Sequence, residues 1–326
     1  MNQTFAVVLA AGKGTRMKSD LPKVLHDVCG KPMVQHVIDQ LQRISMDRII
    51  TVIGHQSEMI KQHLGPSLEY AYQEEQLGTA HAVKMCHEQL ADQQGSTLII
   101  TGDTPLITEK TLRKCLEHHR TTNAAATILT MLPEDPSGYG RIIRDEKGQV
   151  LRIVEHKDAS EKEREVREVN SGIFCFDNKL LFRALEQVST NNQQQEYYLP
   201  DVIEILKHQG EKISATSVYD IEEGLGINNP EQLAHAKDIL QKRIIEYHTS
   251  NGVTVMEPSS TYIEAEVKIG KNTVIEPRTE LKGNTKIGDN CIVGPDIRLW
   301  NYTSINIQKQ QDSSKTDDKS VMSYVK

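Results

Sequence analysis

Several features that would exclude an ordinary globular enzyme are missing from this sequence. No run of about 18 apolar residues is present, so no membrane-spanning helix is expected. The net charge of -7 argues against a nucleic-acid partner. The five cysteines are odd in number and contain no Cys-x-x-Cys pair, so neither a disulfide framework nor a zinc site is expected. The apolar stretch at residues 5–11 lacks a basic leader, and we therefore expect a cytoplasmic protein without membrane insertion.

The chain of 326 residues is long enough for two domains, and its first part alternates between two kinds of pattern. Short apolar runs predict strands at residues 5–9, 48–53, 97–101 and 126–132. Helical patterns between them predict helices at residues 33–43, 58–63, 79–88 and 109–118. Such alternation is typical of an α/β fold with a mostly parallel, Rossmann-like sheet, in which ligands bind beyond the carboxyl ends of the strands.

The second part of the chain has a different period. Asn228-Asn229-Pro230 is typical of a helix start, and this helix should end near Asn251-Gly252. Beyond it an aliphatic residue recurs every six positions, at Ile263, Ile269, Ile275, Leu281, Ile287, Val293 and Leu299. A six-residue repeat with an inward aliphatic position predicts a short parallel β-helix.

We therefore expect four segments along the chain. They are a nucleotide-binding domain at residues 1–228, a linker helix at 229–251, a β-helix at 252–300 and a tail at 301–326. The tail is polar and unpatterned, so we expect it to be disordered.

A small-residue loop directly follows the first predicted strand. It begins Leu9-Ala10-Ala11-Gly12, and its small side chains let the backbone amides come close to phosphate oxygens. Neither the P-loop pattern nor the Rossmann fingerprint is matched. Read alone, the loop could also be a tight turn between a strand and a helix.

Three cations follow within the same short stretch, in an otherwise acidic protein. Lys13, Arg16 and Lys23 could neutralise a triphosphate, although a solvated basic surface is the alternative. Asp103 follows a predicted strand, where a carboxylate together with substrate phosphates suits Mg²⁺. Its alternative role is an ordinary helix cap before Thr108.

The stretch L-A-A-G-K-G-T-R-M followed by L-P-K-V-L is similar to the signature of sugar nucleotidylyltransferases. Further ordered motifs lie at residues 73–80, 102–106, 138–141, 154–158, 170–172 and 226–229. Together they resemble the bacterial bifunctional GlmU family over residues 5–299. That family pairs an N-terminal uridylyltransferase with a C-terminal left-handed β-helix acetyltransferase.

The resemblance implies a role for each matching position. The uridine nucleotide would be held by Leu9, Ala10, Ala11 and Gly12, and its uracil would be read by Gln73, Gly78 and Thr79. Thr101, Gly102 and Asp103 would lie beneath the nucleotide, and Mg²⁺ would be held by Asp103 and Asn228. The N-acetylglucosamine moiety would be bound by Gly140, Glu155 and Asn170. Read without the family, Glu155 and Asn170 could equally be surface and turn residues.

The implied reaction joins UTP and N-acetylglucosamine 1-phosphate into UDP-N-acetylglucosamine, a peptidoglycan precursor, with release of pyrophosphate. The sugar phosphate would attack in line, so no protein nucleophile is needed, and Mg²⁺, Arg16 and Lys23 would neutralise the developing charge. The alternatives are another sugar 1-phosphate or nucleotide, or a non-catalytic assembly subunit. Because the repeat holds about two coils, we do not expect acetyl transfer, and we do not carry over the family's homotrimer.

Overall fold

The computed structural model describes residues 3–301, and the chain divides into two compact units between Gln241 and Lys242. We call them the sheet unit and the β-helix unit. The division falls within the long helix α9 (Pro230–Ser250), which the sequence predicts as a linker at residues 229–251. Residues 302–326 of the predicted disordered tail lie outside the described residues. In the described part of the chain, every helix is too short or too polar to cross a bilayer.

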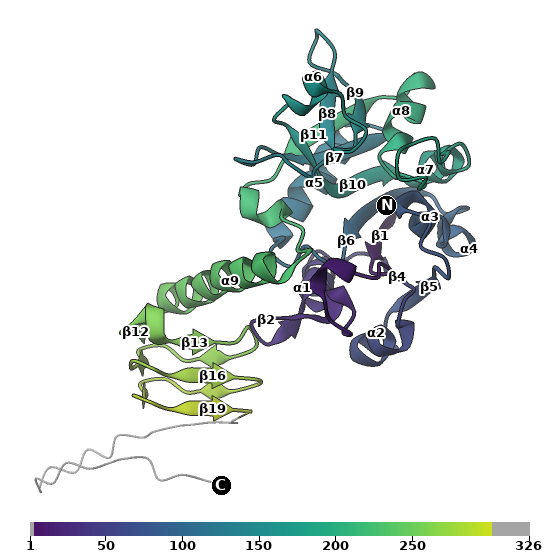
Figure 1. The fold of residues 1–326 in the computed structure, drawn as a ribbon. Coiled ribbons are helices and arrows are strands. Elements are labelled where there is room, and N and C mark those ends of the chain that lie inside the picture. The colour runs from purple at the N-terminus through teal and green to yellow at the C-terminus, as the bar shows by residue number, and fades with distance from the viewer. Residues whose placement is uncertain (1–2, 302–326) are drawn as a thin grey trace, which may run out of the picture. The chain divides into compact units, whose positions relative to one another are not determined.

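The sheet unit is built around a nine-stranded sheet. Seven strands follow the order β11-β7-β10-β6-β1-β4-β5, and along this path β10 runs antiparallel to both of its neighbours while the others run parallel (Figure 1). These strands are β1 (Gln3–Leu9), β4 (Arg48–Ile53), β5 (Glu69–Tyr72), β6 (Gly95–Thr101), β7 (Ala126–Met131), β10 (Val169–Asp177) and β11 (Ile213–Ser217). From β10 the sheet continues into β8 (Arg141–Arg144) and β9 (Val150–Val154). The predicted α/β class with a mostly parallel sheet is confirmed.

Helices cover both faces of this sheet. Alternate residues of a strand point to opposite faces, and here both sets are apolar, so each face is buried under helices. In β1, Phe5 and Val7 pack into one buried cluster and Ala6 and Val8 into the other. The first cluster is covered by α3 (Thr79–Lys84), α4 (His87–Leu90), α7 (Asn178–Leu185) and α8 (Asp201–His208). The second is covered by α1 (Met33–Arg43), α2 (Ser57–Leu64) and α5 (Glu109–Thr122).

The smaller elements of the sheet unit lie in its connections. They are η1 (Thr15–Met17), η2 (Lys23–Leu25), the short hairpin of β2 (Asp27–Val28) and β3 (Lys31–Pro32), α6 (Glu161–Arg164) and η3 (Ile221–Gly224).

One predicted helix is interrupted in the structure. The expected helix at residues 79–88 is two short helices, because α3 ends at Lys84 and α4 begins only at His87. Cys86 precedes α4 with φ -86° and ψ 8°, outside regular helical geometry, and its side chain is buried in the same cluster as Val83. Burial of Cys86 accompanies this break in the helix.

Helix α9 begins and ends with recognisable capping contacts. The Asn229 side chain accepts a hydrogen bond from the Gln232 amide at 2.8 Å, which caps the first turn. Gly252 has φ 87°, and the Val253 amide donates to the His248 carbonyl at 3.1 Å. This is the Schellman arrangement, which glycine favours at a helix C-terminus. Both helix ends predicted from the sequence therefore have a physical cause.

The β-helix unit stacks short parallel strands in three sheets, and Figure 1 shows β13, β16 and β19 lying one below another. The strands are β12 (Thr254–Val255), β13 (Tyr262–Ile263), β14 (Lys268–Ile269), β15 (Val274–Ile275), β16 (Glu280–Lys282), β17 (Lys286–Ile287), β18 (Ile292–Val293) and β19 (Arg298–Trp300), with η4 (Pro258–Ser260) between the first two. Tyr262 pairs with Glu280, and Glu280 pairs with Arg298. One coil therefore spans three six-residue repeats, as the predicted parallel β-helix requires.

A second inward position in each repeat went unnoticed in the sequence. It lies two residues before the aliphatic position and is buried at Thr261, Val267, Thr273, Thr279, Thr285 and Cys291. The threonine hydroxyls are satisfied locally: Thr273 Oγ1 donates to the Gly288 carbonyl at 2.8 Å and Thr279 Oγ1 to the Glu276 carbonyl at 2.7 Å. A polar residue can occupy this core position because the backbone supplies its partner.

Candidate active site

The carboxyl ends of β1, β4 and β6 form the edge at which the predicted nucleotide loop begins. Leu9 is aligned with Val52 of β4 and with Thr101 of β6. The Gly102 amide donates to the Leu9 carbonyl and the Ala10 amide to the Val52 carbonyl, each at 2.9 Å. The loop after β1 and the loop after β6 therefore leave the sheet side by side.

Two cations and two side-chain oxygens meet beyond this edge. The Lys23 amino group donates to Asp103 Oδ2 and, at 3.0 Å, to Asn228 Oδ1. Arg16 Nη2 donates to the same Asn228 oxygen at 2.8 Å. The Asn228 segment is held in place because the Ile227 amide donates to the Asp103 carbonyl at 2.9 Å. Four residues predicted from distant parts of the sequence thus form one cluster.

Gly14 allows the backbone of the loop to pass close to the Lys23 side chain. Its φ of 61° is left-handed, and a Cβ on Gly14 would lie 2.4 Å from the Lys23 Cβ. Any larger residue would therefore displace Lys23 or change the turn that leads into η1. Lys13 is exposed on the same loop, and in residues 3–301 it has no hydrogen bond or ion pair.

Asp103 does not cap the helix that follows it. Thr108 is the N-cap of α5, and its side chain accepts a hydrogen bond from the Thr111 amide at 3.3 Å. The carboxylate of Asp103 instead contacts Lys23. The helix-cap alternative raised by the sequence is therefore excluded.

The residues predicted to read uracil also come together, next to the loop after β1. The Gln73 amide nitrogen lies 3.1 Å from the Gly78 carbonyl oxygen and 3.1 Å from His81 Nδ1. Gly54 makes room for this segment, since a Cβ there would lie 2.6 Å from the Gln73 carbonyl oxygen and 3.0 Å from the Ala11 Cβ. Gln73 is thereby fixed beside Ala11.

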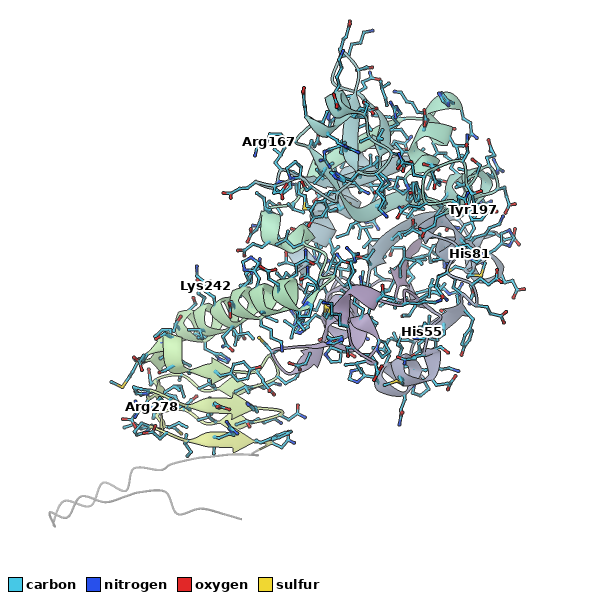
Figure 2. The ribbon with its side chains drawn as sticks, viewed as in Figure 1. His55, His81, Arg167, Tyr197, Lys242 and Arg278 are labelled. Atoms are coloured by element: carbon cyan, nitrogen blue, oxygen red, sulfur yellow. The ribbon has the colours of Figure 1, made fainter. Side chains whose placement is uncertain are left out.

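The segment at Tyr197 and Leu199, for which the sequence predicts no role, contacts the Gly78-Thr79 pair. A Cβ on Gly78 would lie 2.4 Å from the Tyr197 carbonyl oxygen, and the Gly78 φ of 118° is itself one that favours glycine. The Leu199 amide donates to Thr79 Oγ1 at 3.0 Å. His81 and Tyr197 lie near one another in the sheet unit, with ring centroids 6.3 Å apart (Figure 2).

The residues predicted to bind the sugar form a second group, in which Gly140 directly precedes β8, Glu155 directly follows β9 and Asn170 lies in β10. The Asn170 amide donates to the Gly140 carbonyl at 2.8 Å, and Asn170 Oδ1 accepts from the Gly172 amide at 3.0 Å. A Cβ on Gly140 would lie 3.1 Å from Glu155 Oε1. The pairing of β10 with β7 is irregular between Asn170 and Phe174, as at a β-bulge.

This second group is joined to the first through β6. A Cβ on Gly172 would be in contact with the Thr101 side chain, at 3.8 Å. Thr101 is the last residue of β6, two positions before Asp103. Gly172 of β10 therefore lies beside the end of β6 that leads to Asp103.

Glu155 is a largely desolvated carboxylate with a raised pKa. The pKa of Glu155 is raised from 4.5 to about 7, mainly by burial and additionally by the negative charges of Asp158, Asp201 and Glu196. The pKa of Asp201 is also raised, to about 6, mainly by burial. Near neutral pH, Glu155 can therefore either donate or accept a hydrogen bond, which is useful for recognising sugar hydroxyl groups.

The chemistry of Asp103 and Asn228 fits a hard divalent cation. Both present an oxygen to one cation, the Lys23 amino group, so the same two oxygens can face a metal ion. The described residues contain no group of three His, Cys, Asp or Glu side chains placed to bind a metal. The remaining ligands would therefore be substrate phosphates and water, as is usual for Mg²⁺.

Comparison with known proteins identifies two families within the chain. The Nucleotidyl transferase family matches residues 5–220, and the Bacterial transferase hexapeptide family (six repeats) matches residues 266–296. The first match covers the strands and loops that carry most of the candidate site. The chain belongs to the Nucleotidyl transferase family.

Three of the curated proteins to which the chain is similar come from bacteria. Proteins called "Bifunctional protein GlmU" from Listeria monocytogenes serotype 4a (strain HCC23) and from Geobacillus sp. (strain WCH70) are each 55% identical over 282 residues, or 86% of this chain. The corresponding protein of Bacillus subtilis (strain 168) is 54% identical over the same length. The chain is aligned with 61–62% of the length of these relatives.

Two further residues of the motif at residues 138–141, the half-buried Tyr139 and the buried Arg141, lie beside the candidate site. Burial raises the pKa of Tyr139, and the negative charge of Asp103 raises it further. Arg141 is 1% exposed, its Nη1 donates to the Tyr139 carbonyl, and its Nη2 lies 3.4 Å from His156 Nδ1. Arg141 thus connects the loop that carries Gly140 to the loop after Glu155. A single sequence cannot reveal this, because arginine is usually exposed.

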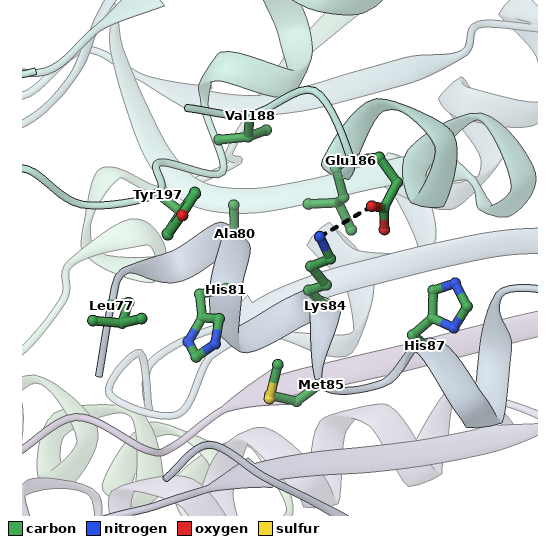
Figure 3. Close-up of a pocket in the computed structure, with 10 residues that line it drawn as sticks. Leu77, Ala80, His81, Lys84, Met85, His87, Glu186, Val188 and Tyr197 are labelled. Atoms are coloured by element: carbon green, nitrogen blue, oxygen red, sulfur yellow. Dashed lines mark hydrogen bonds and ion pairs between the residues drawn. The ribbon is translucent and has the colours of Figure 1, made fainter. Parts of the chain in front are cut away.

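A cavity of about 580 Å³ lies behind the predicted uracil-reading segment (Figure 3). Its lining includes Leu77, His81 and Tyr197, together with the Lys84–Glu186 ion pair at 3.1 Å. None of the predicted site residues is among the described residues that line it. The candidate active site is therefore defined by the clusters on β1, β6 and β10 and not by this cavity.

Proposed function

We propose that this chain transfers a uridylyl group from UTP to N-acetylglucosamine 1-phosphate, forming UDP-N-acetylglucosamine and pyrophosphate with a divalent metal ion, Mg²⁺. The observation that carries the proposal is the meeting of Arg16, Lys23, Asp103 and Asn228 at the carboxyl ends of β1 and β6. Two cations and two oxygen ligands suit a reaction that develops negative charge on phosphate. The similarity to GlmU proteins supports the choice of substrates.

The proposed reaction needs no protein nucleophile. An ionised oxygen of the sugar phosphate attacks the α-phosphorus of UTP, the bond to the bridging oxygen breaks, and pyrophosphate leaves with the electron pair. Asp103 and Asn228 would hold the metal, which supplies charge neutralisation and alignment of the phosphates. Arg16 and Lys23 would stabilise the charge that builds up on the phosphorus and the leaving group.

The two ends of the site would hold the two substrates. Leu9, Ala10, Ala11 and Gly12 would approach the nucleotide, with uracil recognised by Gln73, Gly78 and Thr79. Thr101 and Gly102 would lie beneath it. The sugar would be held by Gly140, Glu155 and Asn170, whose contacts join β8, β9 and β10.

A direct assay tests the proposal. The chain is incubated with UTP, Mg²⁺ and either N-acetylglucosamine 1-phosphate or glucose 1-phosphate, and pyrophosphate release and the sugar nucleotide are measured. We expect the acetylated sugar to be preferred. Preference for glucose 1-phosphate, or for another nucleotide, would support a related pyrophosphorylase, and silence with every pair would support a non-catalytic assembly subunit.

The absence of acetyl transfer stays a prediction. Release of free thiol from acetyl-CoA in the presence of glucosamine 1-phosphate would contradict it, with the uridylyl transfer assay as the positive control.

A further inference from the structure

The amino group of Lys23 lies where the proposed metal ligands converge. It donates to Asp103 Oδ2 and to Asn228 Oδ1, the two oxygens assigned to the metal above. A protein cation is therefore already bound at this position. Lys13, three residues before Arg16 on the same loop, makes no such contact within residues 3–301.

A metal ion held by Asp103 and Asn228 would compete with this ammonium group for the same two acceptor side chains. The Lys23 and Asp103 side chains are 16% and 13% exposed, so solvent screens their attraction only in part. A divalent ion bound to both oxygens would repel a positive charge held at hydrogen-bond distance from them. Binding of the metal therefore favours departure of the Lys23 amino group.

When nucleotide is bound, its phosphate groups offer the Lys23 amino group an alternative partner. The four-carbon stem of Lys23 is flexible and its ammonium group is a compact donor well suited to phosphate. Arg16 shares the Asn228 oxygen at 2.8 Å, so the same event would release a second cation towards the phosphates. Metal entry and the pairing of Lys23 with phosphate thus favour one another.

We propose that Lys23 is an internal counter-cation: it holds Asp103 and Asn228 together in the metal-free protein and moves to the nucleotide phosphates when a divalent ion takes its place. This rests on the proposed function for the identity of the metal ligands. It makes metal alone a weak ligand and makes metal and nucleotide bind cooperatively, because each stabilises the arrangement that the other needs.

The test measures Mn²⁺ binding without nucleotide, from the electron paramagnetic resonance signal of the free ion. Lys23→Met removes the ammonium group and keeps the length of the side chain. We expect it to bind Mn²⁺ at least about tenfold more tightly than the wild type, equivalent to about 1.4 kcal/mol. Lys13→Met removes a charge from the same loop without touching either oxygen, and we expect it to tighten binding less than about twofold.

Two further variants locate the effect. Lys23→Arg keeps a cation, so its Mn²⁺ affinity should stay close to that of the wild type. Adding Asp103→Asn to Lys23→Met should abolish the gain, because the carboxylate that binds the ion is lost. If Lys23→Met does not fold, as judged by its circular dichroism spectrum and thermal midpoint, Lys23→Gln serves for the same comparison.

The inference is overturned if the Lys23 variant binds Mn²⁺ no more tightly than Lys13→Met. A wild-type chain that makes UDP-N-acetylglucosamine would then keep its proposed function. Conversely, tighter Mn²⁺ binding by the Lys23 variant, with no uridylyl transfer by the wild type, would support the counter-cation and reject the proposed function. The two failures are therefore distinguishable.

Discussion

The sheet unit and the β-helix unit are organised by contacts of very different sequence separation. In the candidate site, Lys23 and Asp103 are 80 residues apart in sequence, and Arg16 and Asn228 are 212 residues apart. In the β-helix unit the corresponding residues of neighbouring coils are 18 residues apart, as at Arg278 and Asp296. The β-helix unit is therefore specified by contacts between residues one coil apart, whereas the candidate site depends on long-range pairing of strands.

The two units should also respond separately to substitution. All the residues we place in the candidate site belong to the sheet unit, and the β-helix unit has a buried cluster of aliphatic residues of its own. Changes to the polar cluster should therefore affect turnover, and changes to the aliphatic repeat should affect stability.

The largest effect is expected at the metal ligand. Asp103→Ala should reduce turnover about 10³-fold or more, equivalent to about 4 kcal/mol in activation free energy, because it removes the anionic protein ligand of the metal. The thermal transition of the β-helix unit should stay unchanged. Steady-state kinetics over a Mg²⁺ titration and calorimetry measure the two effects, with the exposed Asp92→Ala as control. A near-normal rate with an unchanged Mg²⁺ dependence would remove Asp103 from the site.

The two cations should have the next largest effect. Lys23→Ala and Arg16→Ala should each lower kcat about 10²-fold and raise the KM for UTP much less, since the extra negative charge develops in the transition state. Lys13→Ala is the matched control. Because Lys23 and Arg16 share Asn228, the double variant should lose less than the product of the two single losses. A raised KM with unchanged kcat would make them docking residues.

A core substitution in the β-helix unit tests the comparison from the other side. Leu281 is fully buried in β16, so Leu281→Ala should destabilise this unit by about 2–5 kcal/mol. Ile292→Ala, at a position 55% exposed, should cost much less. Calorimetry measures the unfolding, and uridylyl transfer is assayed below the transition. If turnover falls in parallel with stability in Leu281→Ala, the units are not independent.

The smallest effect is a pH dependence at the sugar end of the site. The pKa of folded Glu155 is about 7 and its ordinary value is 4.5, so the folded state binds the proton more tightly. The contribution of this proton to the free energy of unfolding is complete below about pH 4.5 and is lost as the pH rises through about 7. Glu155→Gln removes this loss, so the variant should gain about 1–3 kcal/mol relative to wild type between pH 5 and pH 8.

Chemical denaturation at the two pH values measures this difference. The exposed Glu165→Gln should show no such gain. A wild type and a Glu155→Gln variant that keep a constant difference in unfolding free energy across the range would show that Glu155 ionises normally.

Elements with a strong local pattern were predicted well. Helix α1 and strand β4 have the predicted bounds, because α1 has a clear helical period and β4 is a short apolar run that is largely buried in the sheet. The branch formed by β8 and β9 was not predicted. These two strands pair mainly with each other, and a single residue pair, Val169 with Arg141, joins them to β10. Strand pairing of this kind depends on cross-strand neighbours, which a single sequence does not show. The threonine position of the β-helix was missed because a buried hydroxyl needs a partner that only the fold supplies.

For the candidate site, the sequence named most of the residues but not their contacts. Motif resemblance singled out Lys23, Asp103 and Asn228, yet nothing in it places the Lys23 amino group between the two oxygens. Tyr197 has no motif of its own and was missed, although its carbonyl fixes the glycine at position 78. Side-chain roles that depend on a neighbour from another strand are invisible in a single sequence.

By itself, the sequence determined the α/β class, the caps of α9 and the coils of the β-helix, because periodic burial and capping act over a few residues. Only the tertiary structure decided that Arg16, Lys23, Asp103 and Asn228 form one cluster, and that Glu155 is held near a pKa of 7. The reason is physical: ion pairing and desolvation depend on distance in space, and the order of strands in the sheet sets those distances.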